Sequence, residues 1–149
     1  MKTIADIMTR EVITVTRQTS TRDLADLFAS NRIGSIPVVD DGNKLIGIVT
    51  ESDLIKLNKS PHLPTMISLF DWIIYLESEK SLERELQKLG SKTVDDIYQQ
   101  ELITITPDAS ISAAADLMSK HHINALPVVD NQQMVGIVAR LDVIRTLLG

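Results

Sequence analysis

Residues 33–40, IGSIPVVD, and residues 123–130, INALPVVD, are two versions of one segment. Outward from this pair, a shift of 90 residues lays Thr3–Asp41 over Thr93–Asn131, with 16 identities in 39 positions. Beyond the turn the shift becomes 89, and residues 47–55, GIVTESDLI, fall on residues 136–144, GIVARLDVI. Ordered matches of this length indicate an internal duplication, and a repeat fixes the architecture before any local pattern does.

Each copy predicts the order strand, helix, strand, hairpin, strand, helix. Residues 12–15 (VITV) and 102–105 (LITI) are β-branched runs typical of short strands. Apolar residues at i, i+3 and i+4 predict helices over Ser20–Asn31 and Ser110–His121. The remaining predicted elements are strands at IPVVD and LPVVD, a hairpin turn at Asp41-Gly42, a returning strand over Leu45–Val49, and closing helices over Glu51–Leu57 and Arg140–Leu148.

The predicted fold class is α/β (α+β): tandem repeats with pseudo-twofold symmetry, small sheets packed with flanking helices, and a helical insertion. The expected boundaries are residues 1–57 for the first repeat, 58–92 for the insertion and 93–149 for the second repeat. One copy of about 55 residues buries little apolar surface and would be marginal alone. Two copies packed sheet against sheet solve this problem and create two equivalent clefts between the halves.

The insertion between the repeats is rich in apolar residues. It contains Phe70, Trp72 and Tyr75, three of the five aromatic residues of the chain. Helices are predicted from about Thr65 to Glu77 and over SLERELQKL, which Gly90 ends. The first is apolar almost all round, so we expect it to be buried. Either the core of the chain or a subunit interface can bury it.

Composition excludes several function classes. The chain of 149 residues has no cysteine, which excludes disulfides, thiolate metal sites and cysteine nucleophiles. Its net charge is −5 and its basic residues form no run, so no nucleic-acid partner is expected. The apolar stretches are far shorter than the ~20 residues of a membrane span, and the N-terminus lacks an apolar signal segment. These features predict a cytoplasmic protein without a membrane partner.

The duplicated pattern of PVVD, a turn and GIVTESDL resembles the CBS-domain pair (Bateman module), over nearly the whole chain except the insertion. The resemblance implies a stand-alone regulatory module that binds an adenosine-containing ligand such as AMP, ADP, ATP or S-adenosylmethionine. The family's usual determinant is glycine, a hydrophobic pair, Thr or Ser, two variable residues, and Asp. Residues 47–53, GIVTESD, fit fully, whereas residues 136–142, GIVARLD, have Ala139 in place of the hydroxyl residue.

The resemblance also implies that each ligand site joins the strands of one repeat to the aspartate of the other. One implied site consists of Thr16, Ile33, Ser35, Pro37 and Asp142; the other consists of Thr106, Ile123, Pro127, Thr50 and Asp53. A carboxylate can accept hydrogen bonds from both ribose hydroxyls, and each such bond contributes about 1.5–3 kcal/mol. We expect the Asp53 site to be the tighter one, because Thr50 adds a hydroxyl that Ala139 lacks.

Phosphate groups require donors, and the sequence offers few. Arg140 is the best candidate, and Arg32, His121 and His122 are weaker ones. The alternative to phosphate binding is that Arg140 is simply a solvated residue on the surface of its helix. We expect no metal site, because too few oxygen and nitrogen ligands cluster in the sequence.

A structural role for the two aspartates competes with ribose binding. Thr-x-x-Asp at the start of a helix is close to a capping box, which stabilises a helix without any ligand. The second repeat serves as an internal control, because Ala139 cannot cap and yet Asp142 is present. This comparison favours ribose binding, although Asp142 could also simply interact with the helix dipole.

Three expectations follow for the whole protein. It is not an enzyme, because no P-loop, G-x-G-x-x-G, H-E-x-x-H or G-x-S-x-G motif is present. It forms a homodimer and passes its signal to a separate effector protein or to its own assembly. The alternative function is a ligand-free dimerisation or interaction module that docks on a partner protein; Ala139 and the scarcity of basic residues favour it, and the intact first motif opposes it.

Overall fold

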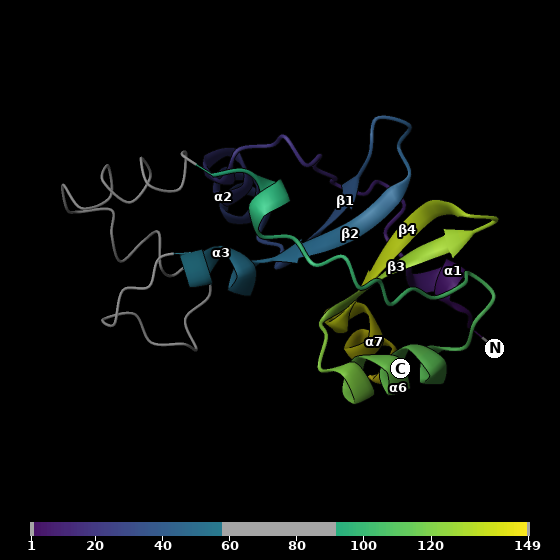
Figure 1. The fold of residues 1–149 in the computed structure, drawn as a ribbon. Coiled ribbons are helices and arrows are strands. Elements are labelled where there is room, and N and C mark those ends of the chain that lie inside the picture. The colour runs from purple at the N-terminus through teal and green to yellow at the C-terminus, as the bar shows by residue number, and fades with distance from the viewer. Residues whose placement is uncertain (1, 58–91, 149) are drawn as a thin grey trace.

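The computed structural model describes residues 2–57 and 92–148, and these contain the same series of elements twice (Figure 1). The predicted helices at 65–77 and 81–89 lie outside the described residues. The elements of the first repeat are α1 (Ile4–Ile7), α2 (Thr21–Asn31), β1 (Ser35–Val39), β2 (Leu45–Thr50) and α3 (Glu51–Leu57). Those of the second are the 3₁₀ turn η1 (Val94–Asp96), α6 (Ile111–His121), β3 (Ala125–Asp130), β4 (Gln133–Ala139) and α7 (Arg140–Leu147). Within the described residues, the predicted helices and hairpins are confirmed to within two residues at their ends.

The helices α2 and α6 begin and end in the same way. The Ser20 hydroxyl accepts a hydrogen bond from the N–H of Asp23, and the Ser110 hydroxyl accepts one from Ala113, each at 3.0 Å. Such caps satisfy N–H groups that have no partner inside the helix. Each helix ends at a residue in the left-handed conformation, Arg32 in α2 and His122 in α6. The duplicated sequence therefore folds into duplicated local structure.

Each repeat has one antiparallel hairpin, β1–β2 or β3–β4, and together they make two separate two-stranded sheets. The pairing Ser35↔Thr50 in one corresponds to Ala125↔Ala139 in the other. Asp40 stabilises the turn between β1 and β2, because its Oδ1 accepts hydrogen bonds from the N–H groups of Gly42 and Lys44. The fold is therefore α+β, with small two-stranded sheets and flanking helices.

The strands predicted at residues 12–15 and 102–105 are reduced to single bridges. Val15 forms a parallel bridge with Val38: its N–H donates to Pro37 O at 3.1 Å and its carbonyl accepts from Val39 at 2.9 Å. The next bond of a parallel ladder would need an N–H on Pro37, which proline lacks. Ile105 and Pro127 repeat this arrangement. The prediction of strands was wrong in length, and proline is the physical reason.

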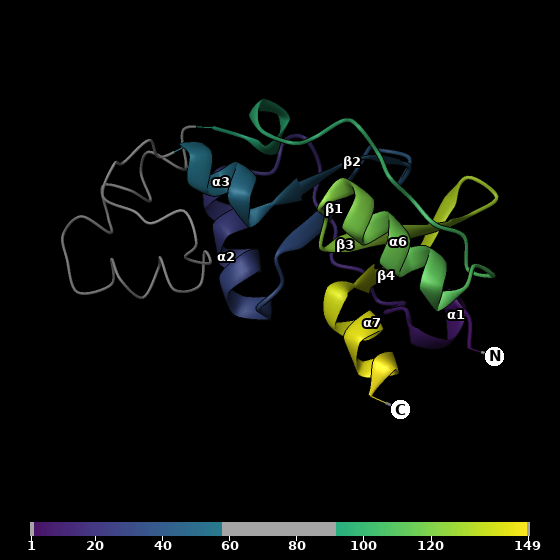
Figure 2. The same ribbon diagram turned by 90° about the horizontal axis from the view of Figure 1, so that it is seen from below.

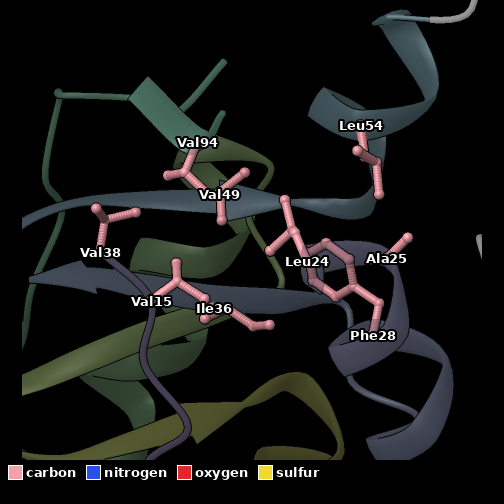
Figure 3. Packing of buried hydrophobic residues seen from close by; sticks show 9 residues of the cluster. All are labelled: Val15, Leu24, Ala25, Phe28, Ile36, Val38, Val49, Leu54 and Val94. Atoms are coloured by element: carbon pink, nitrogen blue, oxygen red, sulfur yellow. The ribbon is translucent and has the colours of Figure 1, made fainter. Parts of the chain in front are cut away.

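Two hydrophobic cores lie beneath the hairpins, one for each half of the molecule. The first packs Leu24, Phe28 and Leu54 of the helices against the strands (Figure 3). The second packs Ala114, Met118 and Val143 of the corresponding helices against its own strands. In both views the two hairpins lie next to each other, with α2 and α3 flanking the first hairpin and α6 and α7 the second (Figures 1 and 2). Each half thus has its own core, and the hairpins bring the halves together.

The first segment of each repeat packs into the core of the other repeat. Ile4 in α1 is fully buried in the second core, and Val94 in η1 is fully buried in the first. Figure 1 shows α1 beside β3 and β4, although it lies at the opposite end of the chain. The backbone of Gln99 exchanges two hydrogen bonds with that of Ile48 on β2, at 2.8 and 3.0 Å. The backbone of Thr9 likewise exchanges two with that of Ile137 on β4, both at 2.9 Å. The two halves are therefore interlocked.

The motif glycines permit this interlocking. A Cβ atom on Gly47 would lie 2.5 Å from the carbonyl oxygen of Gln99, and one on Gly136 would lie 2.9 Å from that of Thr9. From the sequence, a glycine at these positions would let the backbone approach a ligand. In the structure it lets the crossing segment of the other repeat approach.

Candidate functional site: two reciprocal clefts

Two clefts lie between the repeats, and each is built from both of them. We call them the Thr50 cleft, of about 450 Å³, and the Asp142 cleft, of about 380 Å³. The Thr50 cleft joins the apolar residues Ile123 and Pro127 of the second repeat to the start of α3. The Asp142 cleft joins Ile33 and Pro37 of the first repeat to the start of α7. The reciprocity is the one that the family resemblance implies.

The prolines that shorten the predicted strands also shape the clefts. Because the parallel ladder ends at Pro37, the chain before Val15 separates from β1, and Ile13 lines the Asp142 cleft beside Pro37. Ile103 lies beside Pro127 in the Thr50 cleft for the same reason. Each cleft thereby gains an apolar wall made of isoleucines and a proline. Such a wall suits a flat, weakly polar ring.

Aspartate at the start of a short helix is a recurrent structural device in this chain. In four places its Oδ2 accepts a hydrogen bond from the backbone N–H three residues earlier, at 2.7–3.0 Å. The four pairs are Thr3–Asp6, Thr50–Asp53, Thr93–Asp96 and Ala139–Asp142. The backbone hydrogen bond from Thr3 is the largest cause that lowers the pKa of the Asp6 carboxyl. Since this bond needs no side chain at the earlier residue, Ala139 still caps through its N–H, and the internal-control argument for ribose binding fails.

Both oxygens of Asp53 accept hydrogen bonds, from Thr50 of its own repeat and from Gln99 of the second repeat. Besides the N–H of Thr50, its Oδ2 accepts the Thr50 hydroxyl at 3.0 Å. The Gln99 side-chain amide donates to both carboxylate oxygens, at 3.0 and 3.2 Å. The carboxylate is half-buried beneath these donors and does not line the Thr50 cleft, although Thr50 and Gln99 do. A ligand would have to displace Gln99 to reach it.

Asp142 offers a more available carboxylate. Its Oδ2 accepts the N–H of Ala139 at 2.8 Å, and its Oδ1 has no hydrogen bond within residues 2–57 and 92–148. Thr9, which occupies the position equivalent to Gln99, makes no side-chain bond to it. Asp142 lines its cleft directly. Of the two aspartates, only Asp142 presents an oxygen with unused acceptor capacity to a cleft.

The structure brings most of the residues implied by the resemblance into the clefts. Ile33, Ser35, Pro37, Arg140 and Asp142 line the Asp142 cleft, and Ser35, Thr50, Ile123 and Pro127 line the Thr50 cleft. Thr16 and Thr106 line neither. Thr16 is held in a turn, where its N–H donates to the Thr19 hydroxyl at 3.1 Å, and Thr106 is exposed and accepts at its carbonyl from Ala109. The weaker phosphate candidates are also cleft residues, Arg32 in one and both histidines in the other.

Sequence reasoning missed residues at the centre of the site. Both clefts are lined by Gly34, Glu51, Asn124 and Ala125, together with Ser35, which the resemblance implies for the Asp142 cleft, so the two cavities meet along this edge. There the N–H of Glu51 donates to Gly34 O at 3.0 Å, and the N–H of Arg140 donates to Asn124 O at 2.8 Å. The alignment of Glu51 with Arg140 is visible in the duplicated sequence, and it could have signalled the importance of Glu51. No sequence pattern points to Gln99.

The described part of the chain lacks two further features, a metal-binding cluster and a membrane-spanning helix. No group of three or more histidine, aspartate or glutamate side chains there is placed to hold a metal ion. None of the helices in these residues has the length and apolar character needed to cross a lipid bilayer.

Comparison with known proteins agrees with the geometry of the clefts. The family model for the CBS domain matches residues 4–60 and 94–149. An uncharacterized protein of Methanocaldococcus jannaschii is 34% identical over 97% of this chain and 90% of its own length. The CBS domain pair of protein MJ0100 in complex with 5′-methylthioadenosine and S-adenosyl-L-methionine has a TM-score of 0.73 at 26% identity, covering 100% of this chain and 98% of that one. CBSX2 of Arabidopsis thaliana in complex with AMP also has a TM-score of 0.73 at 26% identity, covering 99% and 97%. The chain therefore belongs to the CBS domain family, as a pair of CBS domains.

Proposed function

We propose that this protein is a regulatory module that binds an adenosine-containing ligand and performs no chemistry of its own. The observation that carries the proposal is the Asp142 cleft. It combines an apolar wall, a carboxylate oxygen without a partner among the described residues, and Arg140 at the start of the same helix. Related CBS pairs hold AMP, or 5′-methylthioadenosine and S-adenosyl-L-methionine, in their solved structures. The candidate ligands are therefore AMP, ADP, ATP and S-adenosylmethionine.

The chemistry of the cleft fits each part of such a ligand. The adenine ring would lie between Ile33 and Pro37, and the ribose hydroxyls would donate to Asp142. A volume of about 380 Å³ lies in the usual range for small-molecule sites. The hydrogen bonds of Asp53 reverse the ranking expected from the sequence, because Gln99 and Thr50 already occupy that carboxylate. The Asp142 cleft is thus the primary site.

A bound ligand would act by changing how the two repeats are placed. It contacts strands of one repeat and a helix start of the other, so it favours the arrangement in which both contacts are made. The edge at Glu51 and Asn124 lines both clefts, so occupancy of one cleft changes the other. Couplings of this kind typically amount to about 1–3 kcal/mol. Residues 58–92 join the repeats, and a separate effector protein could read the change there.

Calorimetric titration with AMP, ADP, ATP and S-adenosylmethionine tests the proposal. Asp142→Asn is the informative variant, since its amide oxygen can still accept the N–H of Ala139 while the charge is lost. We expect its affinity to fall about 10-fold to 100-fold, the range for losing a charged hydrogen bond. Asp53→Asn, the matched variant in the other repeat, should change the affinity of this first site less than 3-fold, about 0.6 kcal/mol. Absence of binding by every adenosine compound would refute the proposal.

A second function has support from the surface of α7. Leu141, Ile144, Leu147 and Leu148 expose 43–84% of their area along this helix and its end. Exposed apolar groups in a row on one helix favour docking, and a homodimer is the simplest symmetric solution. In this reading the chain associates through α7 whether or not a ligand binds. Sedimentation as a monomer at micromolar concentration would exclude the dimer.

A further inference from the structure

The two clefts differ most at one equivalent pair of residues. Glu51 and Arg140 both begin the closing helix of their repeat, directly after Thr50 and Ala139. Their backbones are held alike, by hydrogen bonds from their N–H groups to Gly34 O and Asn124 O. The duplication therefore places a carboxylate and a guanidinium at the same point of the two halves.

The charges that line the clefts follow this difference. The Thr50 cleft has the carboxylates of Glu51 and Glu101, and none of its described lining residues is an arginine or a lysine. Its remaining titratable lining residues are His121 and His122. The Asp142 cleft is lined by Arg140 and Arg32, together with three carboxylates. The arginine guanidinium keeps its charge at any working pH.

We propose that the clefts divide the ligands by charge: the Asp142 cleft takes a nucleotide with its phosphate, and the Thr50 cleft takes adenosine derivatives that carry no phosphate. The proposal deepens the proposed function and rests on it. A phosphate in the Asp142 cleft would be within the reach of Arg140, whose planar fork suits phosphate oxygens. In the Thr50 cleft the same phosphate would meet the carboxylates of Glu51 and Glu101, and no arginine or lysine stands among the described lining residues.

The Arg140 side chain is available to a phosphate in one cleft only. The Arg140 side chain forms no hydrogen bond or ion pair within the described residues, so no neighbour there competes with a ligand for it. It does not line the Thr50 cleft, whereas Glu51 lines both. Glu51 therefore adds a carboxylate to both cavities, and of the two only the Asp142 cleft also has arginines among its described lining residues. Phosphate selectivity is thus a property of one cleft.

Calorimetric titrations of AMP and of adenosine at pH 8, on the full chain, test the division. For the natural sequence we expect one AMP site per chain, which binds AMP about 10-fold to 100-fold more tightly than adenosine at that site. Arg140→Glu should abolish this preference, so that AMP binds that site no more tightly than adenosine. Glu51→Arg should raise the stoichiometry of AMP from one to two. Arg145→Glu is the control, because it makes the same charge change on α7 at a residue that lines neither cleft.

The outcomes separate this inference from the function on which it rests. If no adenosine compound binds the natural protein, the proposed function itself fails. If adenosine and AMP bind equally well, or if two AMP molecules bind each chain with equal affinity, only the division between the clefts fails. An Arg140→Glu variant that keeps the AMP preference would also overturn it. Far-UV circular dichroism and thermal melting of each variant show whether the fold is intact.

Discussion

The start of α3 and the start of α7 are copies of one structure with different surroundings. Both place an aspartate three residues after a backbone N–H that it accepts, at 2.8 Å in each case. At α3 the Thr50 hydroxyl and the Gln99 amide complete the coordination of the carboxylate, and at α7 neither contact exists. The lesson is that backbone hydrogen bonds preserve the duplicated frame. The side chains on that frame then differ: donors surround the Asp53 carboxylate, and the Asp142 carboxylate keeps one oxygen without a hydrogen bond among the described residues.

The largest effect should come from breaking the frame itself. Ile4→Ala removes a fully buried side chain from the second core, and Val94→Ala does so in the first. Ile4→Ala should lower the free energy of unfolding by about 2–5 kcal/mol. Val94→Ala should cost about 0.8 kcal/mol less, because valine has one methylene fewer. Urea unfolding measures both values.

Hydrogen exchange locates the damage that these two substitutions cause. In Ile4→Ala, exchange should accelerate at Val128 and Val138 of the second repeat, although the substitution is in the first. Acceleration confined to the β1–β2 hairpin would contradict the interlocked arrangement. If Ile4→Ala does not fold, Ile4→Val keeps the test open at a cost of about 0.5–1.5 kcal/mol.

A smaller effect is expected at Gly47 and Gly136, where a segment of the other repeat packs against β2 and β4. A methyl group on Gly47 would meet the Tyr98 ring and lie 2.5 Å from the backbone oxygen of Gln99. On Gly136 it would lie 2.6 Å from the flexible Met8 sulfur and 2.9 Å from the backbone oxygen of Thr9. Gly47→Ala should therefore cost about 1–3 kcal/mol of stability, and Gly136→Ala should cost less than that. Gly42→Ala is the control, with no contact nearer than 3.5 Å. Thermal melting ranks the three, and equal loss from Gly47→Ala and Gly42→Ala would mean that the crossing is looser than described.

The smallest effect should come from exchanging the caps. Thr50→Ala gives α3 the same preceding residue that α7 has. It should lower stability by about 0.5–2 kcal/mol, since the N–H of Asp53 loses the Thr50 hydroxyl. Ala139→Thr makes the reverse change. Ala139 already has the extended backbone of a capping residue, so we expect a gain of up to about 1 kcal/mol. Both changes are measured by urea unfolding, and a loss of stability in Ala139→Thr would show that the caps are not equivalent.

Much of the fold could be predicted because it depends on local patterns. Ser20 and Ser110 predict the starts of the helices α2 and α6, and the PVV segments predict the strands β1 and β3. The bridges at Val15 and Ile105 were predicted as full strands, since β-propensity is read residue by residue while the interruption comes from a proline more than twenty residues away. The reciprocal docking of Ile4 and Val94 has no local signal either. Contacts of this kind depend on where distant segments meet.

The candidate site was predictable in composition but not in detail. The resemblance placed Ile33, Pro37 and Asp142 at one cleft, where the structure has them. It could not reveal that Gln99 holds Asp53, because a side-chain hydrogen bond between residues 46 positions apart leaves no trace in one sequence. Nor could the identity of Ala139 distinguish a cap from a ligand residue, since the bond that matters comes from its backbone. Backbone donors are the same for every residue except proline.

The docking of each leading segment on the opposite half also fixes when the two cores can be completed during synthesis. Val94 is made 40 residues after Leu54, so at about 5–20 residues per second the first core waits about 2–8 s for its last fully buried side chain. The second core waits for Val143, near the end of the described chain, although Ile4 was made first. Until then α1 has no buried place in its own half. Such long separations between contacting residues slow folding, so translation of the complete pair, and not of either repeat alone, is the event that makes the protein stable.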